Sequence, residues 1–141
     1  MRVEAEVRPT ESVEKVLKAV RNVFDGEIRV EDKGRGYKVV RGYSNTAYSL
    51  HKIHYLLRLY RILDAARKYL HKGIRGNTIV FRLNKQAAYM GRVSFVDSDH
   101  ESPLGSIVFV IETSDPERLV DWLAPKTSMG KPLWEIEMPR D

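Results

Sequence analysis

The chain opens with a strict alternation of apolar and polar residues and then changes to a helical spacing. In residues 2–8, Val3, Ala5 and Val7 alternate with charged side chains, which predicts a half-buried β-strand. Apolar residues then recur every three or four positions over residues 13–24, which predicts an amphipathic helix that ends at Asp25-Gly26. Residues 28–31 and 37–39 alternate again around a glycine-containing turn, so they predict a β-hairpin.

The middle of the chain predicts one long helix from Thr46 to His71. Ser44-Asn45-Thr46 supplies N-cap side chains, and Gly73 follows the last periodic residue. The apolar side of this helix recurs at steps of three and four and is expected in the core. That side comprises Ile53, Leu56, Leu59, Tyr60, Leu63, Ala66 and Leu70.

The second half of the chain predicts further strands and a final helix. Residues 79–83 and 93–96 predict strands on either side of a short helix, 85–90, and the apolar run 107–111 predicts a central strand covered on both faces. Ser114-Asp115-Pro116-Glu117 is a capping box that opens a helix through Leu123, and the tail, 133–138, is expected to form an edge strand or to dock.

The predicted order of elements is β-α-β-β-α-β-β-β-α. Hairpins require antiparallel pairing, so we expect an α+β fold of two layers, with a mixed or antiparallel sheet covered by helices. The length of 141 residues fits a single domain, residues 1–141.

Charge is distributed very unevenly along this sequence. Residues 51–92 hold ten Lys or Arg residues against one acid, Asp64, so this segment carries +9 while the whole chain carries +5. Such a segment needs an anionic partner to offset its self-repulsion, and nucleic acid is the first candidate.

Within the long helix, His54, Arg58, Arg61, Ala65, Lys68 and Lys72 recur at steps of three and four on the side opposite the apolar one. Arg75, Arg82 and Arg92 extend the charge into the following segments. We expect this surface to contact phosphates, although a solvated helix face without a partner is the ordinary alternative.

The segment Asn84-Lys85-Gln86 offers a second candidate contact. If it opens a short helix, its amide groups and the Lys85 ammonium would form a small anion site. The structural alternative is that Asn84 simply caps the helix. The complete set of predicted nucleic-acid-binding residues is Arg58, Arg61, Arg67, Lys68, Lys72, Arg75, Arg82, Asn84, Lys85, Gln86 and Arg92.

No pattern in the sequence indicates catalysis. Cysteine is absent, and no zinc-protease helix, nucleophile elbow or phosphate loop is present, so we predict no catalytic residue, metal site or cofactor. Asp97, Asp99, His100 and Glu101 crowd one loop, where cation binding remains an alternative to ordinary loop polarity. No apolar stretch approaches the roughly 20 residues of a membrane span, so we expect a cytoplasmic protein.

Several short motifs together resemble an uncharacterised archaeal family described as RNA-binding. They lie at residues 7–11, 61–67, 73–77, 91–96, 103–105 and 121–125, and the most specific is Leu83-Asn84-Lys85-Gln86-Ala87-Ala88. This family has a sister group labelled a predicted exosome subunit and is similar in fold to the large-subunit ribosomal protein that binds the small ribosomal RNA. The resemblance implies an α+β fold of that type and an RNA partner.

The sequence therefore favours a non-catalytic RNA-binding protein that contacts phosphates through its basic helix and the cations that follow. The alternative is a protein-protein interaction module whose basic face docks an acidic partner in an RNA-processing or translation complex.

Overall fold

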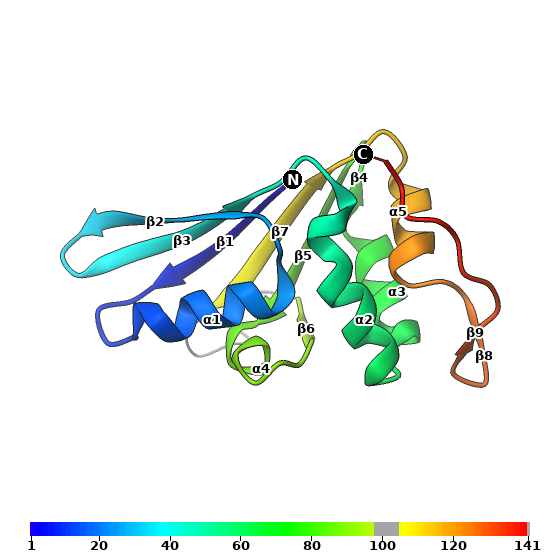
Figure 1. Cartoon of the computed structure of the whole chain (residues 1–141), viewed down its shortest axis with the longest axis horizontal. Helices are drawn as coiled ribbons and strands as arrows, with labels where there is room; N and C mark the ends of the chain where they lie inside the picture. The colour runs from blue at the N-terminus through cyan, green and yellow to red at the C-terminus, as the bar shows by residue number, and fades with distance from the viewer. Residues whose placement is uncertain (98–104, 141) are drawn as a thin grey trace.

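The computed structural model describes residues 1–97 and 105–140 and has an α+β fold of two layers (Figure 1). One antiparallel sheet of seven strands has the path β2-β3-β1-β7-β5-β4, with β6 paired to β5, and β8 and β9 form a separate hairpin. The strands are β1 (Arg2–Val7), β2 (Glu27–Gly34), β3 (Tyr37–Tyr43), β4 (Ile74–Arg75), β5 (Thr78–Asn84), β6 (Phe95–Val96), β7 (Ser106–Glu112), β8 (Thr127–Ser128) and β9 (Lys131–Pro132). The helices are α1 (Val13–Val23), the 3-10 turn η1 (Ala47–Leu50), α2 (His51–Leu59), α3 (Leu63–Lys72), α4 (Lys85–Tyr89) and α5 (Pro116–Leu123).

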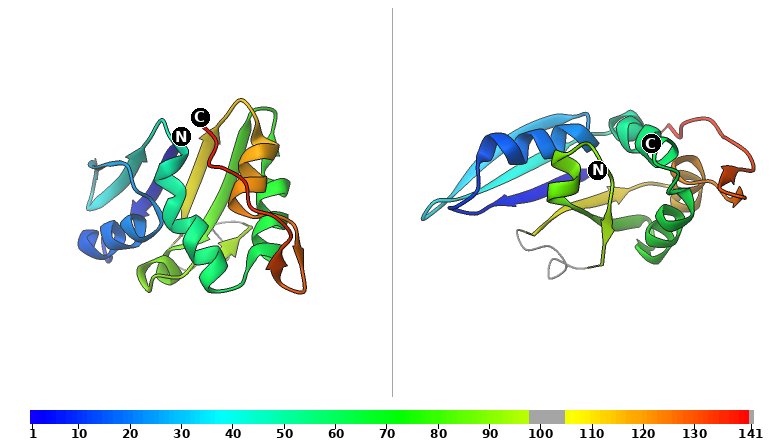
Figure 2. Two further views of the ribbon diagram at one scale, coloured as in Figure 1. Left: turned by 45° about the vertical axis from the view of Figure 1, so that its right-hand side comes forward. Right: turned by 90° about the horizontal axis from the view of Figure 1, so that it is seen from below.

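The alternating pattern of the first strand places one of its faces in the core. Val3, Ala5 and Val7 of β1 are buried, while the charged residues between them are exposed. Helices α1 and α2 lie on the same face of the sheet (Figure 2, right), and the buried side chains point toward them. The predicted layering and antiparallel pairing are therefore confirmed.

The apolar strand β7 is central, as predicted, because it pairs with β1 on one side and with β5 on the other. Ile107, Phe109 and Ile111 are buried, but Val108 and Val110 between them are only half-buried. The expectation that this strand is covered on both faces is therefore wrong for the described residues. On β7, the side chains on one face of the sheet are buried, and those on the other face are partly covered.

The single long helix predicted for residues 46–71 is also wrong, because the chain breaks at Arg61. Arg61 has φ +55°, and its N–H donates to the Arg58 carbonyl while the Ile62 N–H donates to the Leu57 carbonyl. This pair of hydrogen bonds is the Schellman ending of a helix, with a left-handed residue just after the C-cap. Glycine usually occupies that position, so an arginine there gives no signal in the sequence.

The break changes which residues face the core. Ile53, Leu63, Ala66 and Leu70 are buried as predicted, and Leu57, which the continuous-helix pattern left out, is buried as well. Leu59 and Tyr60 are exposed instead, with 52% and 42% of their surface accessible, because α2 ends there and α3 starts with a new direction.

The C-terminal tail docks and adds no strand to the main sheet. Residues 133–140 follow the small β8-β9 hairpin, and Ile136 packs against the core. The Thr127 hydroxyl donates to Asp64 at the start of α3, which fixes the hairpin against that helix. In the described ranges, no helix is both long and apolar enough to cross a membrane.

Candidate nucleic-acid interface

Three of the predicted cations converge on one hollow at the β4 edge of the sheet. Lys72 ends α3, Arg75 lies in β4 and Arg82 lies in β5, and all three line a hollow of about 240 Å³. Arg75 pairs with Thr78 across the hairpin, so it shares a sheet face with Thr78 and Arg82. We call this site the basic hollow and define it by these three residues.

A glycine allows the helix to approach the sheet at this point. A Cβ atom at Gly73 would lie 2.0 Å from the carbonyl oxygen of Val80, so any other residue would force α3 away from β5. The Val80 N–H in turn donates to the Gly73 carbonyl at 3.0 Å. Gly73 thereby brings Lys72 close to the cations of β4 and β5.

The described lining of the basic hollow carries three cations and one carboxylate, Asp97. The Lys72 ammonium lies 2.6 Å from Asp97 Oδ1 and 5.7 Å from the centre of the Tyr69 ring. The two side chains of the Lys72–Asp97 pair are 67% and 45% exposed, and such surface pairs contribute little to stability, so a phosphate can compete with the carboxylate. Arg75 donates from Nη1 to the carbonyls of Lys72 and Ile74.

Lys68 extends the basic hollow along α3. It lies one helical turn before Lys72 and is exposed. The aromatic side of the hollow is formed by Tyr69, whose ring stacks on Phe95 of β6 with centroids 5.3 Å apart. Phe95 was not among the predicted site residues, because a two-residue strand has too short a pattern to reveal its neighbours.

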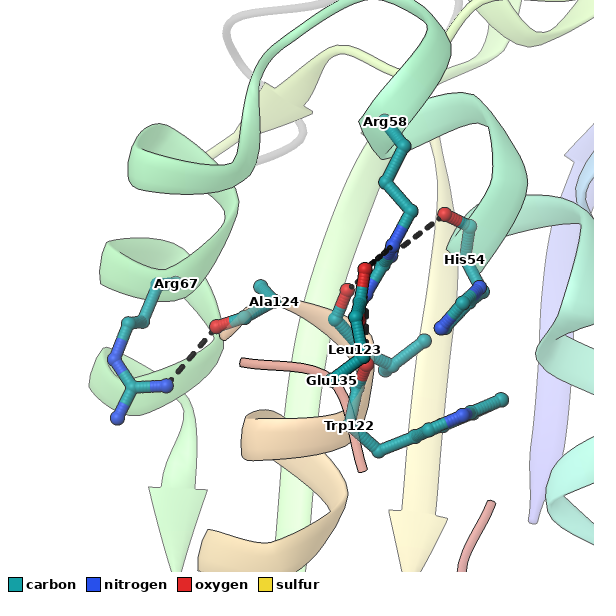
Figure 3. A network of polar contacts seen from close by, with 7 residues as sticks. All are labelled: His54, Arg58, Arg67, Trp122, Leu123, Ala124 and Glu135. Carbon is teal, nitrogen blue, oxygen red and sulfur yellow. Dashed lines mark hydrogen bonds and ion pairs between the residues drawn. The ribbon is translucent and has the colours of Figure 1, made fainter. Parts of the chain in front are cut away.

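Arg58, in contrast, is fully engaged within the fold (Figure 3). Its Nε and Nη2 donate to the two carboxylate oxygens of Glu135, and its remaining bonds reach the carbonyls of His54, Trp122 and Leu123. An arginine has five N–H donors, so these five bonds use all of them. Its side chain is 20% exposed, which leaves little room for a second ligand.

Arg67, on α3, is also engaged within the fold, because it bonds to the C-terminal part of α5. Its Nη1 donates to Asp121 at 2.9 Å. The same nitrogen donates to the carbonyl of Ala124 at 3.0 Å (Figure 3). Arg58 and Arg67 together satisfy carbonyls at the C-terminal end of α5, where a helix leaves acceptors without partners and where positive charge is favoured. The predicted row of solvent-facing cations is therefore covered by α5 over part of its length.

His54 lies in the same covered region. Its ring stacks on Trp122 with centroids 4.7 Å apart. Burial, together with the positive charge of Arg58, lowers the pKa of His54 from 6.5 to about 4. His54 is consequently neutral near pH 7, and it adds no charge to the surface.

The predicted anion site at Asn84-Lys85-Gln86 is already filled by the chain itself. Asn84 Oδ1 accepts from the Ala87 N–H, as the capping alternative expected. The Lys85 ammonium is buried and donates to the carboxylate of Glu11 and to the carbonyl of Glu6. Glu11 and Lys85 are 74 residues apart, so only the fold reveals that the two motifs meet. Gln86 is exposed beside them and lines a separate hollow on α1.

The remaining predicted cations, Arg61 and Arg92, are exposed near the break between α2 and α3. The Arg92 guanidinium lies 5.5 Å from the centre of the Tyr60 ring. Asp97, the one described member of the acidic loop, is bound to Lys72, whereas Asp99, His100 and Glu101 lie outside the described residues. Over 1–97 and 105–140, no group of three or more histidine and acidic side chains is arranged to hold a metal ion.

The fold and the site together define a class of protein: an antiparallel α+β protein with a cluster of cations at one edge of its sheet. The chain belongs to the family described as RNA binding, whose model matches residues 1–113. Its relatives carry the name UPF0201 protein. One from Sulfurisphaera tokodaii is 55% identical over 139 residues, which is 99% of this chain and 96% of the relative.

Solved structures agree with this assignment. The crystal structure of a UPF0201 protein from Methanococcus jannaschii superimposes with a TM-score of 0.83 at 34% identity, over 94% of this chain and 97% of that one. A DUF54 protein from Methanothermobacter thermautotrophicus superimposes with a TM-score of 0.55 at 23% identity, over 81% of this chain and 83% of that one. The second likeness shows a common fold.

Proposed function

We propose that this protein binds RNA through phosphate contacts from Lys68, Lys72, Arg75 and Arg82, and that it acts as a binding protein without catalysis. The observation that carries this proposal is the convergence of Lys72, Arg75 and Arg82, from three separate elements, on one hollow. The description of the family as RNA binding supports the nature of the partner.

The chemistry of the basic hollow suits a phosphate backbone. Guanidinium groups bind phosphate oxygens through paired N–H donors, and an ammonium adds a further charged donor. The hollow contains a single described carboxylate, Asp97, against three cations. Binding of a polyanion releases its counterions, so the affinity should fall steeply as salt is added.

The proposed contacts are fewer than the sequence suggests. We leave out Arg58, Arg67 and Lys85 because their side chains are engaged inside the fold and are also largely buried, unlike that of Arg75. Asn84 is left out because its amide oxygen caps α4. Gln86 is left out because it lines a different hollow, on α1. Arg61 and Arg92 are exposed away from these internal contacts and form a second group beside Tyr60.

Charge reversal tests this proposal. We expect the double variant Lys72→Glu/Arg75→Glu to lose most of its RNA affinity at low salt, as measured by fluorescence anisotropy. The matched control, Lys33→Glu/Arg35→Glu, makes the same change of net charge at exposed residues of the β2-β3 hairpin, on the opposite edge of the sheet. Equal affinities of the two variants would contradict the proposal.

A docking site for an acidic protein is the alternative use of the same cations. Recovery of partners on immobilised protein, before and after nuclease treatment of a lysate, separates the two functions. Co-purified RNA that is lost from the Lys72→Glu/Arg75→Glu variant but kept by the hairpin control supports RNA binding. A protein partner whose recovery is unchanged by nuclease, with no RNA bound, would favour the alternative.

A further inference from the structure

The outward side of α2 exposes an unusual amount of aromatic surface. Tyr48 is 56% exposed, Tyr55 61%, Leu59 52% and Tyr60 42%. We call these four residues the tyrosine face. Large apolar side chains that gather on the surface of a protein commonly mark an interaction site, and none of these residues belongs to the basic hollow.

The four residues lie on two consecutive elements. Tyr55 and Leu59 are one turn apart on α2, Tyr48 lies in the 3-10 turn η1 that precedes it, and Tyr60 is the C-cap residue of α2. A shallow hollow of about 420 Å³ lies beside the tyrosine face and is lined by Tyr55, Leu56 and Gly91, among others. The Tyr48 ring stacks on His51, with centroids 4.5 Å apart, so one face of this ring is already covered by the protein.

The charge around the tyrosine face favours an anionic partner. No acid lies in η1, α2 or α4, and among the described residues the one acid paired with this surface, Asp25, is bound to His51 beside Tyr48. At the other end, Arg92 lies over the Tyr60 ring and Arg61 follows it. A second copy of this chain that used the same face about a two-fold axis would bring these cations together. A partner that combines flat apolar groups with negative charge fits better, and nucleobases on a phosphate backbone have both properties.

The tyrosine face and the basic hollow lie on opposite sides of the sheet. Arg82 pairs with Val108, whose side chain points away from the buried face that α1 and α2 cover. The cations beside the tyrosine face are instead Arg61, which follows Tyr60, and Arg92, which lies over its ring. These two exposed arginines can contact the phosphates of a strand whose bases stack on the tyrosines.

We propose that the tyrosine face binds unpaired bases of single-stranded RNA by stacking, while Arg61 and Arg92 beside it contact the phosphates of the same strand. This inference rests on the proposed function and adds the state of the RNA that the protein selects. Bases in a duplex are already stacked between their neighbours, so the tyrosines can reach only unpaired ones. The protein should therefore prefer a single strand to a duplex of the same sequence.

The test compares tyrosine variants on paired and unpaired RNA. We expect Tyr55→Ala and Tyr60→Ala each to weaken binding of a labelled single strand about five-fold or more, since stacking on an aromatic side chain contributes that much per base. Binding of the duplex made from the same strand should not change. Tyr55→Phe keeps the ring and should bind like the wild type. Tyr37→Ala serves as the control, because this tyrosine on β3 is about as exposed as Tyr60.

Salt dependence and oligomeric state complete the test. The slope of log affinity against log salt should be the same for Tyr55→Ala and the wild type, because no phosphate contact is lost. If the wild type binds RNA and Tyr55→Ala binds the single strand equally well, the stacking proposal is wrong and the proposed function stands. If the wild type binds no RNA, both are wrong. A concentration-dependent dimer that Tyr55→Ala abolishes would overturn the proposal in favour of self-association.

Discussion

Arg58 and Lys72 show how differently two cations of one basic segment are used. Arg58 donates all five of its N–H groups to the fold, and three of its acceptors are backbone carbonyls. Lys72 is exposed and forms an ion pair with Asp97 in which the two side chains are 67% and 45% exposed. At the scale of the residue, a cation is therefore available to a ligand only if its donors are not already needed to hold helices together.

Replacement of Arg58 should affect stability and leave RNA binding largely intact. We expect Arg58→Ala to lower the free energy of unfolding by on the order of 2–3 kcal/mol, because Glu135 and the α5 carbonyls lose charged donors. Chemical denaturation measures this loss, with Lys68→Ala as a control that should stay within about 0.5 kcal/mol of the wild type. An unchanged stability together with weakened RNA binding would place Arg58 in the interface instead.

The His54 ring makes stability depend on pH. In the unfolded chain it takes up a proton near its ordinary pKa of 6.5, but in the folded chain the pKa is about 4, so the unfolded state binds more protons between these values. Stability should therefore fall as the pH is lowered from about 6.5 to about 4. The hydrogen bond from Arg58 lowers the pKa of Glu135, which adds a further loss at the acid end of this range.

The variant His54→Phe isolates that contribution. A phenyl ring can still stack on Trp122 but takes up no proton. Between pH 7 and pH 4.5 the wild type should lose more free energy of unfolding than the variant does, when both are measured by denaturant titration. Identical pH profiles would mean that His54 is not buried in its neutral form.

At the scale of the element, the break between α2 and α3 decides which side chains reach the surface. Arg61 adopts a left-handed conformation, which disfavours residues with a Cβ atom. The change in direction exposes Leu59 and Tyr60 and turns α3 so that Lys68 and Lys72 run toward the β4 edge.

Glycine at position 61 should stabilise this break. We expect Arg61→Gly to raise the free energy of unfolding by a few tenths to about 1 kcal/mol, because the relief of left-handed strain outweighs the added flexibility of the unfolded chain. The matched control, Ala65→Gly on the exposed side of α3, should lose about 1 kcal/mol. If Arg61→Gly loses as much as the control, the segment is a continuous helix.

Much of this fold is predictable from local patterns. Each strand or helix that the sequence predicts correctly has either an alternation of apolar and polar residues or a capping residue of its own. Asn84 caps α4 through a bond from the Ala87 N–H, as the sequence predicts. The capping box predicted at Ser114 is wrong, because the N-cap residue of α5 is Asp115, which accepts from the Arg118 N–H. The break at Arg61 is not visible in the sequence, because an arginine occupies the position where this hydrogen-bond pattern usually has a glycine.

The candidate site was predictable in composition but not in geometry. The sequence locates the cations, but whether they meet depends on contacts between distant segments. Lys85 and Glu11 illustrate this point, since the most specific motif of the chain turns out to hold a buried ion pair across 74 residues. Arg58 likewise reaches Glu135 across 77 residues. No local spacing reports such pairings.

At the scale of the whole molecule, the two edges of the sheet differ in how their charge is balanced. Near the β2 edge, Arg29 pairs with Glu27, and Arg41 pairs with both Glu4 and Glu31. At the β4 edge, the basic hollow is lined by three cations, and Asp97 is the one acidic residue among its described lining residues. Among the described residues, these cations near the β2 edge are therefore paired with acids, whereas the lining of the basic hollow holds more cations than acids.

The salt dependence of RNA binding tests this account most directly. The affinity of the wild type for a single strand should fall with a log-log slope of about −0.7 for each phosphate neutralised, and Lys72→Gln/Arg75→Gln should reduce the magnitude of that slope by roughly 1.4. The control Lys33→Gln/Arg35→Gln should keep the wild-type slope. Equal slopes for the wild type and both double variants would contradict the claim that the basic hollow binds the RNA backbone.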